Sequence, residues 1–181
     1  VATGLFDQVI VATDNDLIFK EIFENGGKVT MTENDHRCGT DRIAEVVAKM
    51  EADVVINVQG DEPFVDKVSL KNLIDVFYND PQKEIALASL MTPLHKSKEV
   101  QNPSVVKVIV DLNNYALYFS RSPIPCDRDN DKSSRYFKHV GVYAFRKQAL
   151  IEFSEQEVTP LESAEKIECI RYLEHGNKIK M

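Results

Sequence analysis

Apolar and polar residues along the chain follow two alternating periods in its first half. Short β-branched runs predict buried strands, and apolar residues at helical spacing predict amphipathic helices between them. The predicted strands are 8–14, 28–31 and 54–58, and the predicted helices are 16–23, 41–50 and 68–77. Strands that alternate with helices in this way predict βαβ units and a sheet covered on both faces.

The second half of the chain has a different pattern, with little predicted helix between its strands. The predicted strands there are 85–91, 104–111, 115–120, 135–145 and the closing 178–181. A helix is predicted from Thr159 to near Gly176, because Thr159, Pro160 and Glu162 form an N-cap, a proline at the first helical position and a capping box. We therefore predict a mixed sheet, or a β-rich flap on an α/β core.

Composition fits one globular domain, with 181 residues, 43% hydrophobic and 28% charged. A net charge of −7 gives no basic field, so we expect no nucleic-acid partner. The three cysteines, Cys38, Cys126 and Cys169, show no metal-binding or disulfide spacing, which suits a cytoplasmic protein. No apolar run approaches a membrane span, so we expect no membrane partner.

The strand 54–58 is followed at once by the polar residues Gln59, Gly60, Asp61 and Glu62. Ligands of open α/β sheets bind outside the carboxyl ends of the strands. A carboxylate such as Asp61 could there hold Mg²⁺ against a nucleotide phosphate. The alternative is a turn whose acidic side chains are solvated.

The polar segment 36–42, HRCGTDR, precedes the helix 41–50. Thr40 is predicted as its N-cap, and Gly39 and Thr40 would bring free backbone N–H groups to the loop. With Arg37 and Arg42 beside them, these groups could bind a phosphate or a base edge. The alternative is a capped helix with a surface arginine pair.

Polar residues of three further segments allow a functional and a structural interpretation. Arg121 ends a strand and could clamp a carboxylate or form a salt bridge. His139 and Tyr143 are four apart, so on a strand they face the same side, in a site or on a half-buried surface. Every third residue of 162–168 is glutamate, which by default predicts a solvated acidic stripe.

Taken in order, these segments resemble the CMP-KDO synthetases, the 3-deoxy-manno-octulosonate cytidylyltransferases. The matching stretches are IVATDND, ENDHRCGTDRIAEV, VINVQGDEP, NPSVVKVIVD, YALYFSRSPIPCDR, KHVGVYAFR and PLESAEKIECIRYLEHG. They cover almost the whole chain.

The resemblance implies a three-layer α/β/α, Rossmann-like nucleotide-diphospho-sugar transferase fold with a mixed, mostly parallel sheet, usually in a homodimer. It implies transfer from CTP to 3-deoxy-D-manno-octulosonate (KDO) with Mg²⁺, giving CMP-KDO and pyrophosphate for lipopolysaccharide biosynthesis. The residue roles it implies are a catalytic, metal-binding Asp61; nucleotide-binding Gly39, Thr40 and Arg42; and sugar-binding Gln59, Arg121, His139, Tyr143 and Glu168. No side chain is assigned as general base.

The sequence departs from the family pattern at its ends and at two cysteines. A phosphate-gripping RxxSxRxPxKxL loop and a second metal-binding aspartate, in a GxDTPEDL-like segment, do not occur in it. Cys38 stands where serine is usual, and Cys169 where some members have glutamine. We expect a single nucleotidyltransferase domain, 1–181, that is incomplete at both ends and inactive as these residues alone.

Three other functions remain open from the sequence. A cytidylyltransferase for another acidic sugar, such as sialic acid, would share the reaction and the carboxylate of the substrate. The chain could also be a non-catalytic nucleotide-binding or dimerisation module. In that case the full reading frame would lack the phosphate-gripping loop and the second metal-binding aspartate. A GT-A-like glycosyltransferase would normally carry a DxD motif at the strand end, where this chain has QGDEP.

Overall fold

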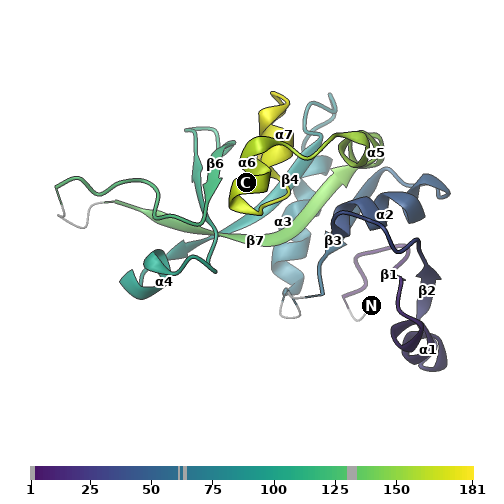
Figure 1. Cartoon of the computed structure of the whole chain (residues 1–181). Helices are drawn as coiled ribbons and strands as arrows, with labels where there is room; N and C mark the ends of the chain where they lie inside the picture. Colours follow the sequence, from purple (N-terminus) through teal and green to yellow (C-terminus); the bar gives the residue numbers. More distant parts are fainter. Residues whose placement is uncertain (1–2, 61, 63–64, 130–133) are drawn as a thin grey trace.

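The computed structural model describes residues 3–60, 62, 65–129 and 134–181 (Figure 1). Its strands are β1 (Ile10–Thr13), β2 (Lys28–Met31), β3 (Val54–Val58), β4 (Leu87–Leu94), β5 (Lys107–Val110), β6 (Ala116–Ser120), β7 (Tyr136–Arg146) and β8 (Ile179–Lys180). Its helices are α1 (Asp16–Glu24), α2 (Gly39–Ala48), α3 (Lys67–Tyr78), α4 (Ser97–Gln101), α5 (Lys147–Glu155), α6 (Pro160–Glu165) and α7 (Ile170–Glu174).

The long strand β7 forms the axis of the main sheet (Figure 1). One edge of β7 pairs along most of its length with β4. The other edge is shared, because β3 pairs with residues 142–146 and β5 pairs with residues 137–138. This division leaves the middle of β7 between the end of one strand and the start of another.

The predicted mixed sheet is confirmed, but the prediction that it is mostly parallel is wrong. β7 runs antiparallel to β3, β4 and β5, and β5 and β6 form an antiparallel hairpin. β4 pairs in parallel with β8, and β1 with β2 in a separate two-stranded sheet. The physical reason is that β7 lies between β3 and β4. These two strands run in the same direction, and without β7 a helical crossover would place them side by side as a parallel pair.

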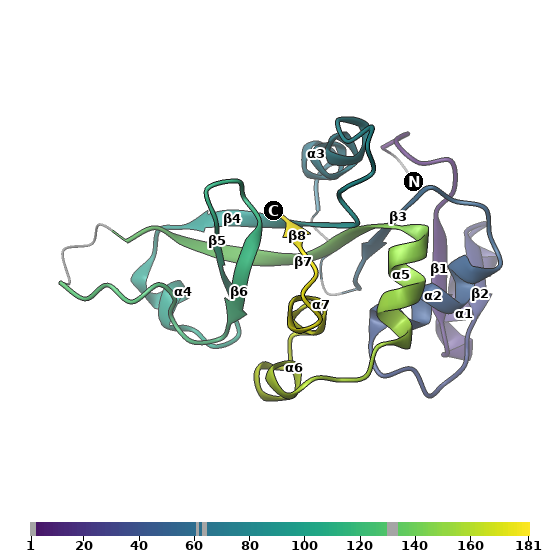
Figure 2. The same ribbon diagram turned by 90° about the horizontal axis from the view of Figure 1, so that it is seen from above.

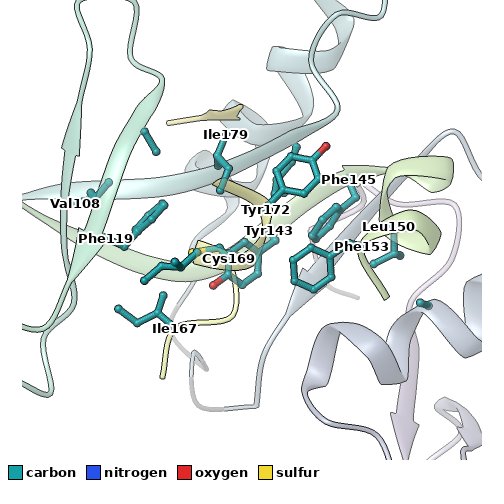
Figure 3. Packing of buried hydrophobic residues seen from close by; sticks show 14 of the residues in the cluster. Val108, Phe119, Tyr143, Phe145, Leu150, Phe153, Ile167, Cys169, Tyr172 and Ile179 are labelled. Carbon is teal, nitrogen blue, oxygen red and sulfur yellow. The ribbon is translucent and has the colours of Figure 1, made fainter. Parts of the chain in front are cut away.

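Side-chain alternation along β7 builds the three layers (Figure 2). Val142 and Ala144 face α3 and belong to one buried cluster, whose helical members include Leu73. Tyr143 and Phe145 point to the opposite face, where they pack with α5, α7 and the segment before α7 (Figure 3). Because neighbouring strand residues point to opposite faces, one strand supplies both cores. The predicted α/β/α arrangement is confirmed.

The helices differ from the prediction in three places. α4 and α5 were not predicted, and the single helix expected after Thr159 is two short helices. Lys166 ends α6 with a φ of 54°, in the left-handed region, so a continuous helix stops there. The helix start is as predicted, with Pro160 in the first turn and the backbone N–H of Thr159 donating to Glu162 at 3.3 Å. None of the helices in the described ranges is long and apolar enough to cross a membrane.

Candidate functional site

A cavity of about 620 Å³ opens where β3 ends and β5 begins along the shared edge of β7. Segments that are far apart in the sequence form its wall: the start of α2, the residues after β3, the middle of β7 and the segment between α6 and α7. Six sequence-predicted site residues line it: Gly39, Gln59, Arg121, His139, Tyr143 and Glu168. The fold therefore brings most of the predicted site together.

Glu168 connects three of these segments through hydrogen bonds. Its Oε1 accepts from the hydroxyl of Thr40 and from Nε2 of Gln59, each at 2.8 Å. Burial raises the pKa of Glu168, and hydrogen bonds from Cys38 and Thr40 oppose that shift. A carboxylate fixed in this way presents a defined set of acceptor positions to a ligand in the cavity.

Thr40 does not act as the predicted N-cap. The helix α2 begins at Gly39, and its N-cap is Cys38, which has the extended backbone that the cap position requires. Thr40 is therefore already inside the first turn, with a completely buried side chain. Burial raises the pKa of the Cys38 thiol, and the nearby Glu168 carboxylate adds to that shift.

His139 and Tyr143 lie on the same face of β7, as their spacing predicts, with ring centroids 5.5 Å apart. His139 Nε2 is 2.9 Å from the hydroxyl of Ser89. Burial, with a smaller contribution from the charge of Lys138, lowers the pKa of His139 to about 3. Burial also raises the pKa of Tyr143 well above its ordinary value. Both side chains are therefore neutral near pH 7, which suits hydrogen bonding to a ligand and not proton abstraction.

The buried imidazole of His139 predicts a loss of stability in acid. Its folded pKa of about 3 lies below the ordinary value of 6.5, so the unfolded chain binds a proton that the folded chain does not. The full contribution is present above pH 6.5. Below it, the free energy of unfolding is expected to fall by up to about 1.4 kcal/mol per pH unit until the folded pKa is reached.

Urea unfolding at a series of pH values measures this effect in wild type and in His139→Asn. The variant is expected to lose this component of the pH dependence. Replacement of the exposed His95 by asparagine is the matched control and should keep it. The same pH slope in wild type and His139→Asn would contradict the prediction.

Arg121 is held by backbone carbonyl groups. Its guanidinium donates to the carbonyl oxygens of Glu165 (2.6 Å), Pro103 (3.0 Å) and Lys166 (3.1 Å). The Glu165 carboxylate accepts instead from the backbone N–H of Arg121 and from the hydroxyl of Ser120. A guanidinium has five N–H groups, so two remain for a ligand while the others fix its place in the wall.

Two buried cations that support the cavity were missed at the sequence level. The Lys107 amine, fully buried, donates to the carbonyl oxygens of Asn102 (3.0 Å), Val105 (2.6 Å) and Arg121. These contacts tie the cavity wall before β5 to the turn that carries Arg121. A lysine inside the apolar run VVKVIV was the available signal.

The other missed cation is Arg171, and it overturns the prediction of a solvated acidic stripe. Its guanidinium, also fully buried, donates to both carboxylate oxygens of Glu162, at 2.7 and 2.8 Å. Glu165 and Glu168 have the partners given above, so each of the three glutamates is engaged within the protein. The prediction of a stripe is wrong because α6 ends before Glu168, so this residue does not share a helix face with Glu162 and Glu165.

The remaining predicted residues are not part of the described cavity wall. Arg42 donates to Asp14 and to Thr32, each at 2.6 Å, and so links α2 to the residues after β1 and β2. Asp61 lies outside the described residues. Its neighbours Gln59 and Glu62 both line the cavity. The nucleotide role of Arg42 and the metal role of Asp61 stay predictions.

Comparison with known proteins decides the family. Residues 1–179 match the protein family described as Cytidylyltransferase. The chain belongs to the cytidylyltransferase family. A 3-deoxy-manno-octulosonate cytidylyltransferase of Flavobacterium johnsoniae is 54% identical to it over 181 residues, 100% of this chain and 74% of the relative. The corresponding protein of Christiangramia forsetii is 55% identical over all of this chain and 73% of its own length.

Solved structures of other proteins have the same fold as this cytidylyltransferase. A CMP:2-keto-3-deoxy-manno-octonic acid synthetase complexed with CTP superposes with a TM-score of 0.90 at 41% identity, covering 98% of this chain and 72% of that one. A 4-diphosphocytidyl-2C-methyl-D-erythritol synthase from Anaerococcus prevotii gives a TM-score of 0.57 at 16% identity, over 99% of this chain and 73% of that one, which supports the Rossmann-like fold alone.

Proposed function

We propose that this protein transfers CMP from CTP to KDO, releasing pyrophosphate and forming CMP-KDO for lipopolysaccharide biosynthesis. The carrying observation is that the cavity gathers Gln59, Arg121, His139, Tyr143 and Glu168 into one wall. Support also comes from relatives more than half identical over the whole chain that bear the name of this activity.

In the proposed mechanism the protein acts by positioning. The anomeric hydroxyl of KDO attacks the α-phosphorus of CTP, and pyrophosphate leaves in line. Gln59, Arg121 and the neutral His139 and Tyr143 side chains hold the sugar by hydrogen bonds, and Glu168 accepts from its hydroxyls. The nucleotide lies against the start of α2, where Gly39 lines the cavity. No side chain is given the role of general base.

Mg²⁺ is proposed as the cofactor, held by Asp61. The described residues contain no group of three or more His, Cys, Asp or Glu side chains able to hold a metal. Mg²⁺ takes one or two protein carboxylates and completes its shell with phosphate and water, so a site at Asp61 would need few other protein ligands. The carboxylate of Glu62 lines the same cavity. When bound, the ion would neutralise charge on the phosphates.

Pyrophosphate release by the full-length gene product tests the reaction. CTP and Mg²⁺ are supplied with KDO, with sialic acid or without sugar, beside the variants Asp61→Asn and Asp66→Asn. Release with KDO is expected in wild type and in Asp66→Asn, whose altered side chain caps α3, and is expected to be abolished in Asp61→Asn. Release with sialic acid alone would favour the other acidic-sugar enzyme. No release with any sugar would favour a non-catalytic nucleotide-binding module.

We also propose a cytoplasmic homodimer. Three free cysteines, Cys38, Cys126 and Cys169, suit a reducing compartment. Exposed apolar side chains of the β5–β6 hairpin, such as Leu112 in its turn and Leu117 in β6, offer surface that a partner could bury. Light scattering of the full-length gene product is expected to give twice the mass of one chain, and a monomer would contradict the dimer.

A further inference from the structure

The hydroxyl of Thr40 both donates and accepts a hydrogen bond inside the protein. It accepts a hydrogen bond from Nδ2 of Asn57 at 3.0 Å and donates its only proton to Oε1 of Glu168 at 2.8 Å. The side chain is completely buried, and Asn57 is 1% exposed. Little is therefore left of this hydroxyl for a nucleotide, although it belongs to the helix start expected to contact one.

Asn57, Thr40 and Glu168 come from three different parts of the fold, so their hydrogen bonds hold these parts together at the cavity. Asn57 lies within β3 and pairs with Tyr143 of β7, so its backbone is fixed by the sheet. Thr40 lies in the first turn of α2, and Glu168 lies in the segment between α6 and α7. Asn57 thereby orients the Thr40 hydroxyl, which in turn orients Glu168. Gln59 donates to the same carboxylate oxygen at 2.8 Å.

We propose that Thr40, anchored by Asn57, is a positioning residue of the sugar subsite that acts through Glu168 and is not a contact of the nucleotide. This inference rests on the proposed function and changes the role that the family resemblance implies for Thr40. Loss of the hydroxyl would leave the buried Asn57 amide short of an acceptor and Glu168 short of a donor. The carboxylate would then turn away from the position in which it meets the sugar.

The variants Thr40→Val and Thr40→Ser separate the two roles in the full-length gene product. Valine keeps the shape of threonine without the hydroxyl, and serine keeps the hydroxyl without the methyl group. In Thr40→Val, the KM for KDO is expected to rise about 10- to 100-fold, the loss typical of a misplaced contact group. The KM for CTP is expected to change less than about twofold, because the nucleotide meets backbone groups here. In Thr40→Ser, the KM for KDO is expected to stay close to the wild-type value.

A second variant keeps the threonine and redirects its proton. In Asn57→Asp, a carboxylate acceptor faces Thr40, so the hydroxyl donates to residue 57 and no longer to Glu168. The same rise in the KM for KDO is expected, again with the KM for CTP unchanged. This variant keeps the inference testable if Thr40→Val proves too unstable to assay.

The contradicting results are specific. A rise in the KM for CTP equal to or larger than that for KDO, or weaker CTP binding in calorimetry, would overturn the inference and restore Thr40 as a nucleotide contact. Unchanged KM values in both variants would overturn the positioning role. Failure of the proposed function looks different, because wild type itself would then form no CMP-KDO. If wild type uses another acidic sugar, the same comparison applies to the KM for that sugar.

Discussion

Replacing Arg171 with methionine is expected to lower the free energy of unfolding by about 3–5 kcal/mol, the cost of leaving a buried charge without its partner. The guanidinium contacts both carboxylate oxygens of Glu162 and lies 4.8 Å from the ring centre of Phe153. Asp41 is 3.5 Å away. Methionine would fill the space but leave the buried Glu162 carboxylate without its cation, while Asp41 keeps its ion pair with Arg37 at 2.9 Å. The substitution would therefore join α7 less firmly to α6. Denaturant unfolding measures the change.

The exposed pair Lys71–Asp75 supplies the control for this prediction. Their charged groups are 2.5 Å apart on the surface of α3. Lys71→Met is expected to change the free energy of unfolding by at most about 0.5 kcal/mol, because solvent screens exposed ion pairs. In the double variant Arg171→Met, Glu162→Leu, part of the lost stability should return as the unpaired charge is removed. Equal losses in Arg171→Met and Lys71→Met would contradict the role of the buried pair.

Replacing Glu168 with alanine is expected to lower kcat/KM for KDO about 10²- to 10³-fold, the magnitude typical of a group that positions or stabilises the reacting centre. The substitution removes the sugar contact and leaves the Thr40 and Gln59 donors without their common acceptor. Glu168→Gln keeps an acceptor oxygen but loses the charge, so an intermediate loss is expected. Steady-state kinetics with each substrate varied in turn measures both variants.

Glu157→Ala is the control for the Glu168 variants, because Glu157 is an exposed acid close to the same end of the chain. Its kcat/KM should equal that of wild type within error. A Glu168→Ala protein with nearly wild-type kcat/KM for KDO would show that this carboxylate is not part of the sugar subsite.

Local patterns predicted the elements of the first half of the chain well. The β-branched runs 28–31 and 54–58 are β2 and β3 to the residue. The period of two placed His139 and Tyr143 on one face, since that geometry follows from the strand alone. The strand order of the sheet could not be predicted from these patterns. β7 pairs with β3 and β4, which are distant from it in the sequence, and a local hydrophobic period carries no information about such pairing.

The connections within the site lie beyond local patterns for the same reason. Thr40 and Glu168 are 128 residues apart in the sequence, and their hydrogen bond exists only through the fold. From spacing alone, Glu168 belonged to an acidic stripe, and Arg171 was one more residue of a helix. The family resemblance supplied the site residues, while the physical roles of Thr40, Lys107 and Arg171 required the packed structure.

A competition reaction tests the central proposal most directly, namely that this cavity is the sugar site of a KDO cytidylyltransferase. The full-length gene product would be given CTP and Mg²⁺ with equal concentrations of KDO and sialic acid, and both CMP-sugars quantified by mass spectrometry at low conversion. The product ratio equals the ratio of the two kcat/KM values. CMP-KDO is expected in at least about 100-fold excess, as suits a site whose polar groups are matched to one sugar. Equal amounts, or an excess of the sialic acid product, would contradict the proposal.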